Sequence, residues 1–216
     1  MNKFDRTCLL ITRKNYCNIF LQKQLTVFSS IAGLYVDGTF KSAPKFFHQL
    51  FTILGLSSVH YVHLAFFLQA NKHPTCYDDV FRRTVSYAAK TGVNFFPTMV
   101  YADFQTAIHI KVKTVWPGLE VKACRFHFGQ SWWRKMQSLG LRKQHGKKES
   151  KLSQFLKKIF GLSLILPAEV CEFFALEFST NLPNDKRVEQ FRDNLLENYI
   201  DADSNFPLPL WSECTV

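Results

Sequence analysis

The sequence lacks any apolar run long enough to cross a membrane. Its longest apolar stretch, residues 159–166, stops at Pro167, far short of the roughly 20 residues that span a bilayer. The beginning of the sequence also lacks the apolar core of a secretory signal, because Arg13 and Lys14 interrupt the short run that starts at Cys8. We therefore expect a soluble, intracellular protein with no membrane partner.

Paired cysteines, internal repeats and low-complexity tracts are absent as well. The six cysteines are scattered and form no CxxC pair, which excludes a disulfide framework or a zinc ribbon and predicts reduced thiols. Proline and glycine number only 8 and 9, whereas 47% of the residues are hydrophobic, including 22 Phe and 4 Trp. This composition is typical of a folded globular chain with a large aromatic core.

Acidic side chains are few and are almost missing from one segment. The 27 Lys and Arg exceed the 17 Asp and Glu, for a net charge of +10. Residues 134–158 hold nine basic side chains and one acidic, whereas residues 159–216 hold three basic and ten acidic. Such a basic segment favours a polyanionic partner, nucleic acid first. A solvated lysine-rich face is the alternative that charge alone leaves open.

The hydrophobic pattern predicts an α/β core with the order βββαβαβα. Three successive β-prone runs predict an antiparallel meander, after which strands and helices alternate. The expected strands are 34–36, 47–54, 61–68, 98–101 and 121–128, and the expected helices are 78–90, 104–116 and 132–140.

The flanking regions are less regular. Residues 1–32 are expected to be irregular or helical, with a helix over 16–27 as their one regular element. Residues 142–152 are polar and basic and predict a loop. Beyond the loop we expect helices at 152–160, 168–178 and 186–199 and then a proline-rich segment, residues 206–211. The expected domains are therefore residues 1–32, 33–141 and 142–216.

Two aspartates stand out because each closes a predicted strand. Asp37 ends the first strand and Asp103 the fourth, 66 residues later. If those strands are neighbours, the two carboxylates face each other and can share Mg²⁺ or Mn²⁺, hard ions that prefer oxygen ligands. A pair of such ions stabilises phosphoryl displacement. The alternative is that Asp37 belongs to an Asp-Gly turn and Asp103 caps a helix.

The residues around these aspartates form an ordered series of motifs. The series is DGTFK at 37–41, ADF at 102–104, WPG at 116–118, CRFHFGQ at 124–130 and WRK at 133–135. It strongly resembles the catalytic domain of Mutator-like element (MULE) transposases, over about residues 33–211. The whole series is far more specific than any one of its motifs.

The resemblance implies a fold and an activity. Members of the family have a ribonuclease H-like fold, a mixed five-stranded sheet flanked by helices with a helical insertion. An Asp-Asp-Glu triad holds two metal ions, Mg²⁺ or Mn²⁺, and the enzyme cleaves transposon ends and joins them to target DNA. Asp37 and Asp103 match the first two acidic residues. Cys124 and His127 match the family's Cys/His motif, and family members act as multimers.

The sequence departs from the family at the third acidic residue. That residue follows a proline-rich segment ending in Trp, whereas this sequence stops five residues after Trp211. The chain is therefore expected to be a truncated or decayed transposase fragment. Gln105 also stands where the family often has an acidic residue. Substitute carboxylates, which are otherwise a solvated helix face or a frayed end, are Glu169, Glu172, Glu177 and Glu213.

Two further functions stay open. A non-enzymatic DNA-binding or interaction protein derived from a transposase would use the basic segment, and an unrelated ribonuclease H-like nuclease would act on RNA. The candidate phosphate contacts are Arg134, Lys135, Arg142, Lys143, Lys147 and Lys148. The stretch 142–148 also resembles a nuclear localisation patch.

Two further pairs of residues, one of tryptophans and one of a cysteine with a histidine, are also candidates for function. Trp132 and Trp133 point to different helix faces, so one belongs to the core and the other at most stacks on unpaired bases. Cys124 and His127 have no second pair of ligands at zinc spacing. We expect a core cysteine and a histidine near the active site rather than a zinc site.

Overall fold

The chain folds into two compact units, Met1–Val121 and Lys122–Val216, which we call the sheet unit and the helical unit. In this computed structural model the described residues are 8–13, 16–21, 28, 30–90, 92–146, 150–181 and 183–212, the first two ranges by their backbone only. Within these ranges no helix is long and apolar enough to span a bilayer. The sequence-based domain boundaries at 32/33 and 141/142 stay predictions.

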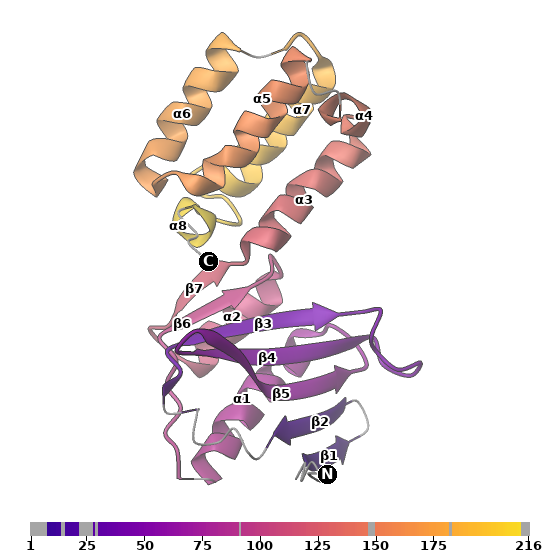
Figure 1. Ribbon diagram of the computed structural model, residues 1–216, viewed down its shortest axis with the longest axis vertical. Coiled ribbons are helices and arrows are strands. Elements are labelled where there is room, and N and C mark those ends of the chain that lie inside the picture. The colour runs from indigo at the N-terminus through magenta and orange to yellow at the C-terminus, as the bar shows by residue number, and fades with distance from the viewer. Residues whose placement is uncertain are drawn as a thin grey trace. The chain divides into compact units, whose positions relative to one another are not determined.

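The sheet has the strand order β1-β2-β5-β4-β3-β6-β7 (Figure 1). Strands β3, β4 and β5 form the predicted antiparallel meander, and β6 runs parallel to β3. The five strands from β5 to β7 are the expected mixed sheet flanked by helices, which confirms the α/β, ribonuclease H-like fold class. The bounds are β1 Cys8–Arg13, β2 Tyr16–Leu21, β3 Gly33–Thr39, β4 Gln49–Ser57, β5 His60–Gln69, β6 Met99–Ala102 and β7 Glu120–Ala123.

Helices α1 (Pro74–Lys90) and α2 (Thr106–Val115) pack on each other and cover one face of the sheet (Figure 1). Phe51 of β4 meets this layer, with its ring 5.4 Å from the ring of Tyr77 and 6.2 Å from that of Phe81. All three side chains are fully buried. Helix α1 begins one turn before the predicted 78–90 because Pro74 suits the first turn of a helix.

The N-terminal prediction was wrong. Residues 8–13 and 16–21 are strands rather than irregular or helical, and β2 pairs antiparallel with β5, from Tyr16 opposite Gln69 to Phe20 opposite Ala65. The expected helix over 16–27 is therefore absent from 16–21, and 22–27 lies outside the described residues. A strand that pairs with a partner so distant in sequence leaves little local signal.

The helical unit contains six α-helices among its described residues: α3 Arg125–Ser138, α4 Arg142–His145, α5 Lys151–Phe160, α6 Pro167–Thr180, α7 Lys186–Leu195 and α8 Leu208–Trp211. Its core is aromatic. The ring of Trp132 lies 4.2 Å from that of Phe128 and 5.8 Å from that of Trp211, and Trp211 stacks on Phe128 at 4.6 Å. Helices α5, α6 and α7 confirm the three helices expected after the basic segment.

Three element boundaries in this region differ from the prediction. The strand expected over 121–128 ends at Ala123, because the Phe128 amide already donates a helical hydrogen bond to the Cys124 carbonyl at 2.9 Å. The loop expected over 142–152 contains the short helix α4, and the Ser150 hydroxyl caps α5. The proline-rich segment closes with α8, whose first turn accepts proline.

Candidate active site

The register of two parallel strands brings Asp37 and Asp103 to the same level of the sheet. Strand β3 pairs with β6 at Gly33–Met99, Leu34–Val100 and Tyr35–Tyr101. Each pair is offset by 66 residues, and the same offset, continued two positions past the last pair, would bring Asp103 level with Asp37. Neighbouring strands lie about 4.8 Å apart. Asp37 therefore lies near the carboxyl end of β3, and Asp103 directly follows the carboxyl end of β6, the strand paired with it.

Both aspartates also lie on the same face of the sheet. Side chains alternate between faces along a strand, so Asp37 shares its face with Tyr35, and Asp103 shares its face with Tyr101. The two tyrosine rings stack at 4.6 Å with an interplanar angle of 6°, which fixes their common face. The intervening Val36 and Ala102 are buried on the opposite face. Both carboxylates are half-buried.

Local hydrogen bonds hold the carboxylates in place. The Thr39 hydroxyl donates to Asp37 Oδ2 at 3.4 Å, and the Gln105 backbone N–H donates to Asp103 Oδ1 at 3.0 Å. His109 Nε2 lies 2.6 Å from the backbone carbonyl oxygen of Asp103. Burial lowers the pKa of His109, although Asp103 opposes that shift, so at neutral pH a neutral ring donates to this carbonyl.

The donor set fits a divalent cation with two protein ligands. Carboxylate oxygens suit Mg²⁺ or Mn²⁺, and Mg²⁺ commonly takes one or two carboxylates and fills its remaining positions with water and substrate phosphate. Across the described ranges, no cluster of three or more His, Cys, Asp or Glu side chains is arranged to hold a metal ion. Asp37 and Asp103 are therefore the two candidate ligands that the described residues offer at this end of the sheet.

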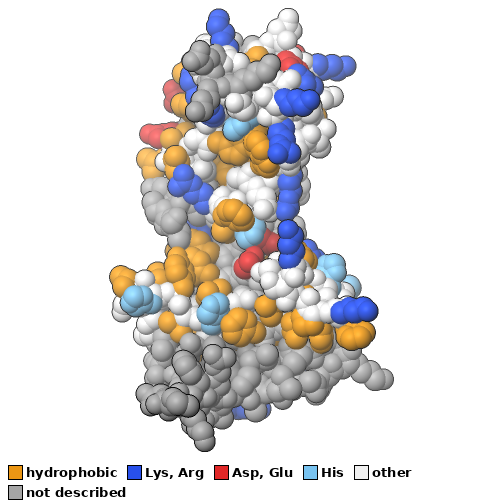
Figure 2. Space-filling model, turned by 45° about the vertical axis from the view of Figure 1, so that its right-hand side comes forward, with side chains coloured by type: hydrophobic (Ala, Val, Ile, Leu, Met, Phe, Trp, Pro, Cys, Tyr) orange, Lys and Arg blue, Asp and Glu red, His pale blue; other side chains and the backbone are white. Residues whose placement is uncertain are grey.

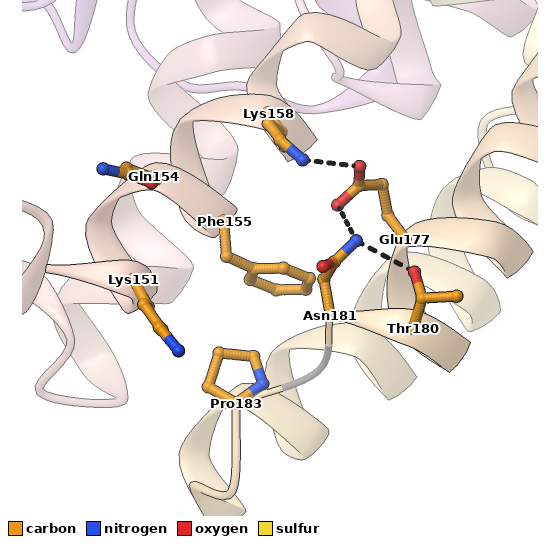
Figure 3. A pocket seen from close by; sticks show the side chains of 8 residues that line it. All are labelled: Lys151, Gln154, Phe155, Lys158, Glu177, Thr180, Asn181 and Pro183. Carbon is orange, nitrogen blue, oxygen red and sulfur yellow. Dashed lines mark hydrogen bonds and ion pairs between the residues drawn. The ribbon is translucent and has the colours of Figure 1, made fainter.

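Of the four substitute carboxylates, Glu177 is held by side-chain partners within the helical unit. Glu177 is buried in the helical unit, where its Oε1 accepts from Lys158 Nζ at 2.8 Å and its Oε2 from Asn181 Nδ2 at 3.1 Å (Figure 3). An ion pair of this kind joins α5 to α6. Glu169 and Glu172 are exposed on α6. Glu213 lies outside the described residues.

Cys124 and His127 come together at the first turn of α3. Cys124 occupies the N-cap position. Burial raises the pKa of its thiol, but the hydrogen bond and charge of His127 outweigh burial, and the net pKa is lowered. The interaction favours the thiolate form of Cys124. The predicted role of this pair near the reacting groups stays a prediction.

The candidate DNA-contacting residues lie on and after α3. Arg134 is exposed and Lys135 half-buried on α3, and Arg142 and Lys143 are exposed on α4. Figure 2 shows Lys and Arg side chains gathered along one side of this unit, next to exposed hydrophobic groups. Lys147 and Lys148 lie outside the described residues.

The two adjacent tryptophans differ as predicted. Trp132 is 1% exposed and belongs to the core, whereas Trp133 is half-buried. Trp133 lines a shallow groove of about 680 Å³ along α3, together with Arg125, Phe126 and Phe160. Phe126 is 70% exposed there. The groove combines aromatic rings with a guanidinium group, a combination suited to stacking on bases.

Sequence reasoning missed a row of buried polar residues beneath the aspartates. Gln49 and Tyr77 are almost fully buried and are hydrogen-bonded to each other, and Tyr77 is bonded to Gln105. The one signal available was a glutamine at a position where the alternating pattern of β4 demands an apolar residue. Tyr77 gave no such signal because a tyrosine on the packed face of a helix is not unusual.

Comparison with known proteins places these features in a family. A search of curated proteins finds no match. The family model of the MULE transposase domain matches residues 33–131. This range runs from the start of β3 to the middle of α3 and contains both aspartates as well as Cys124 and His127. Residues 33–131 of this chain are therefore a MULE transposase domain.

Proposed function

We propose that this MULE domain is a divalent-metal-dependent DNA-cleaving domain in which Asp37 and Asp103 hold Mg²⁺ or Mn²⁺. The observation that supports the proposal is the parallel pairing of β3 with β6, the strands that carry or directly precede the two aspartates. Two adjacent carboxylates repel each other, and a divalent cation between them relieves that repulsion. DNA is the substrate because the family acts on transposon ends.

Residues next to the two aspartates orient the carboxylates. Thr39 and Gln105 each orient one oxygen of the neighbouring carboxylate, Oδ2 of Asp37 and Oδ1 of Asp103. When bound, the ion supplies Lewis-acid polarisation of a phosphoryl oxygen and an activated water.

Calorimetric titration with Mn²⁺ and Mg²⁺, followed by nicking of supercoiled plasmid, tests the proposal. We expect saturable metal binding, and nicking that requires the metal and stops when EDTA removes it. An RNA–DNA hybrid serves as the control substrate, because its preferential hydrolysis would support the ribonuclease alternative. A folded chain that binds neither ion would contradict the proposed function.

A second function, DNA binding without catalysis, is favoured by the groove on α3 and the basic residues beside it. Each Lys or Arg that neutralises a phosphate releases counterions and steepens the dependence of affinity on salt. The stretch 142–148 supports a nuclear location for either function, and the family resemblance supports self-association on DNA ends.

The salt dependence of duplex binding separates this second function from the first. We expect an Arg134→Ala/Lys135→Ala variant to flatten the slope of log affinity against log salt by up to about 1.8, or roughly 0.9 per lost phosphate contact. Lys186→Ala is the control, since Lys186 is an exposed cation of α7 in the acidic half of the helical unit. Fluorescence anisotropy measures both variants. Equal slopes for the two variants and the parent chain would rule these residues out.

A further inference from the structure

A continuous chain of polar side chains runs through the otherwise apolar layer between the sheet and α1. Gln49 and Gln69 are each 1% exposed and Tyr77 is 0% exposed. Gln49 Nε2 donates to Gln69 Oε1 and, at 3.0 Å, to the Tyr77 hydroxyl, which in turn donates to Gln105 Oε1 at 3.0 Å. We call Gln49, Tyr77 and Gln105 the polar relay.

Burial of these groups is costly, which calls for an explanation. A buried polar group destabilises a fold unless it is hydrogen-bonded, and an apolar side chain of similar size fills the same space at lower cost. Within the described residues, Gln69 Nε2 has no hydrogen-bond partner at all. The relay together with Gln69 therefore makes the core less stable than an apolar packing would, which points to a role other than stability.

One end of the relay fixes the segment that carries Asp103. Gln105 occupies the N-cap position of α2, yet its side chain makes no capping bond there and turns to the Tyr77 hydroxyl instead. The backbone N–H of the same residue donates to Asp103 Oδ1 at 3.0 Å. Tyr77 thus holds, through Gln105, the very peptide that orients the second carboxylate.

The other end lies beneath the segment that carries Asp37. A Cβ atom added to Gly38 would sit 2.7 Å from Gln49 Oε1, so the glutamine amide packs directly on the backbone of the residue after Asp37. A larger residue at position 38 would displace the glutamine amide from this position. The relay therefore touches both aspartate-bearing segments.

The relay is chemically able to keep this arrangement over the whole neutral range. Burial raises the pKa of Tyr77 to about 12, so its hydroxyl stays protonated and keeps donating to Gln105. The ring of Tyr77 packs separately on Phe51. The hydroxyl can consequently be removed without removing the ring from the core.

We propose that the polar relay positions the two carboxylates for a shared divalent cation by tying Gly38 and Gln105 to one buried scaffold. This inference rests on the proposed metal binding and adds three positioning residues to it. None of the three is one of the two proposed metal ligands. Removal of a group that orients a metal ligand typically lowers the metal affinity 10–100-fold.

The test is a Tyr77→Phe variant titrated with Mn²⁺ by calorimetry, with thermal unfolding followed in parallel. We expect affinity for Mn²⁺ to fall by about 10-fold or more. The matched control is Thr84→Val, which removes another fully buried hydroxyl from the same helix, one that bonds only to the Val80 carbonyl at 2.9 Å. This control is expected to leave the affinity for Mn²⁺ unchanged, whichever way its melting temperature moves.

A double variant provides a second measure of the bond between Tyr77 and Gln105. If Tyr77 and Gln105 act through one bond, Tyr77→Phe/Gln105→Leu should lose no more affinity than the worse single variant. Equal Mn²⁺ affinity of Tyr77→Phe and the parent chain would overturn the relay and leave the metal site standing. Absence of Mn²⁺ binding by the folded parent chain would overturn both.

Discussion

An Asp37→Asn variant is expected to lose Mn²⁺ binding almost completely. The change removes one of two carboxylate ligands, so the loss should exceed the roughly 10–100-fold that follows when groups behind a metal ligand are altered. Asp103→Asn should give the same result, because it removes the other proposed carboxylate ligand. Calorimetry at a temperature where every variant is folded measures the loss.

Stability supplies an independent readout of the same site. Without metal, Asp37→Asn relieves repulsion between adjacent carboxylates, so the melting temperature should stay equal or rise. With Mn²⁺ at about 100 times its dissociation constant, the parent chain should gain about 2.7 kcal/mol and the variant nothing. Asp79→Asn, a change in a half-buried aspartate of α1, is the control. A metal-dependent gain that survives in Asp37→Asn would place the cation elsewhere.

A Trp132→Ala variant is expected to lose about 3–5 kcal/mol of unfolding free energy, the usual cost of truncating a buried tryptophan. Its ring is 1% exposed and contacts Phe128 at 4.2 Å and Tyr199 at 5.7 Å, so the cavity opens at the centre of the helical unit. Urea unfolding followed by far-UV circular dichroism measures the change.

The adjacent Trp133→Ala is the matched control for this effect. Trp133 is half-buried along the groove and touches His145 at 5.1 Å, so its removal should cost about 1 kcal/mol or less. The same variant is expected to weaken binding to single-stranded DNA if its ring stacks on bases. Equal destabilisation by the two substitutions would show that the core is not centred on Trp132.

The sequence predicted the parts of the fold that depend on local pattern. The strands around Asp37 and Asp103 and the helices α1, α2, α5, α6 and α7 follow from periodicity, and the structure contains them. The side-by-side placement of the aspartates needed one further assumption, that their strands are neighbours. The pairing of β3 with β6 supplies it. The roles of these aspartates in binding metal stay predictions.

What could not be predicted depends on contacts between distant residues. Strand β2 forms a hairpin with β1 and joins the sheet through its pairing with β5, nearly fifty residues further along. The polar relay joins Gln49, Tyr77 and Gln105, each 28 residues from the next, and no periodicity marks such a set. The early start of α3 reflects aromatic packing one turn apart, which overrides the strand preference of residues 124–128.

The parallel pairing of β3 with β6 has a consequence for the order of folding. The chain between these strands contains β4, β5 and α1, so the aspartates meet only after a long loop has closed. Contacts of such sequence separation form late, because the entropy of closure must be offset by earlier local structure. Repulsion between the two carboxylates therefore develops late in folding, after the apolar sheet beneath them has formed.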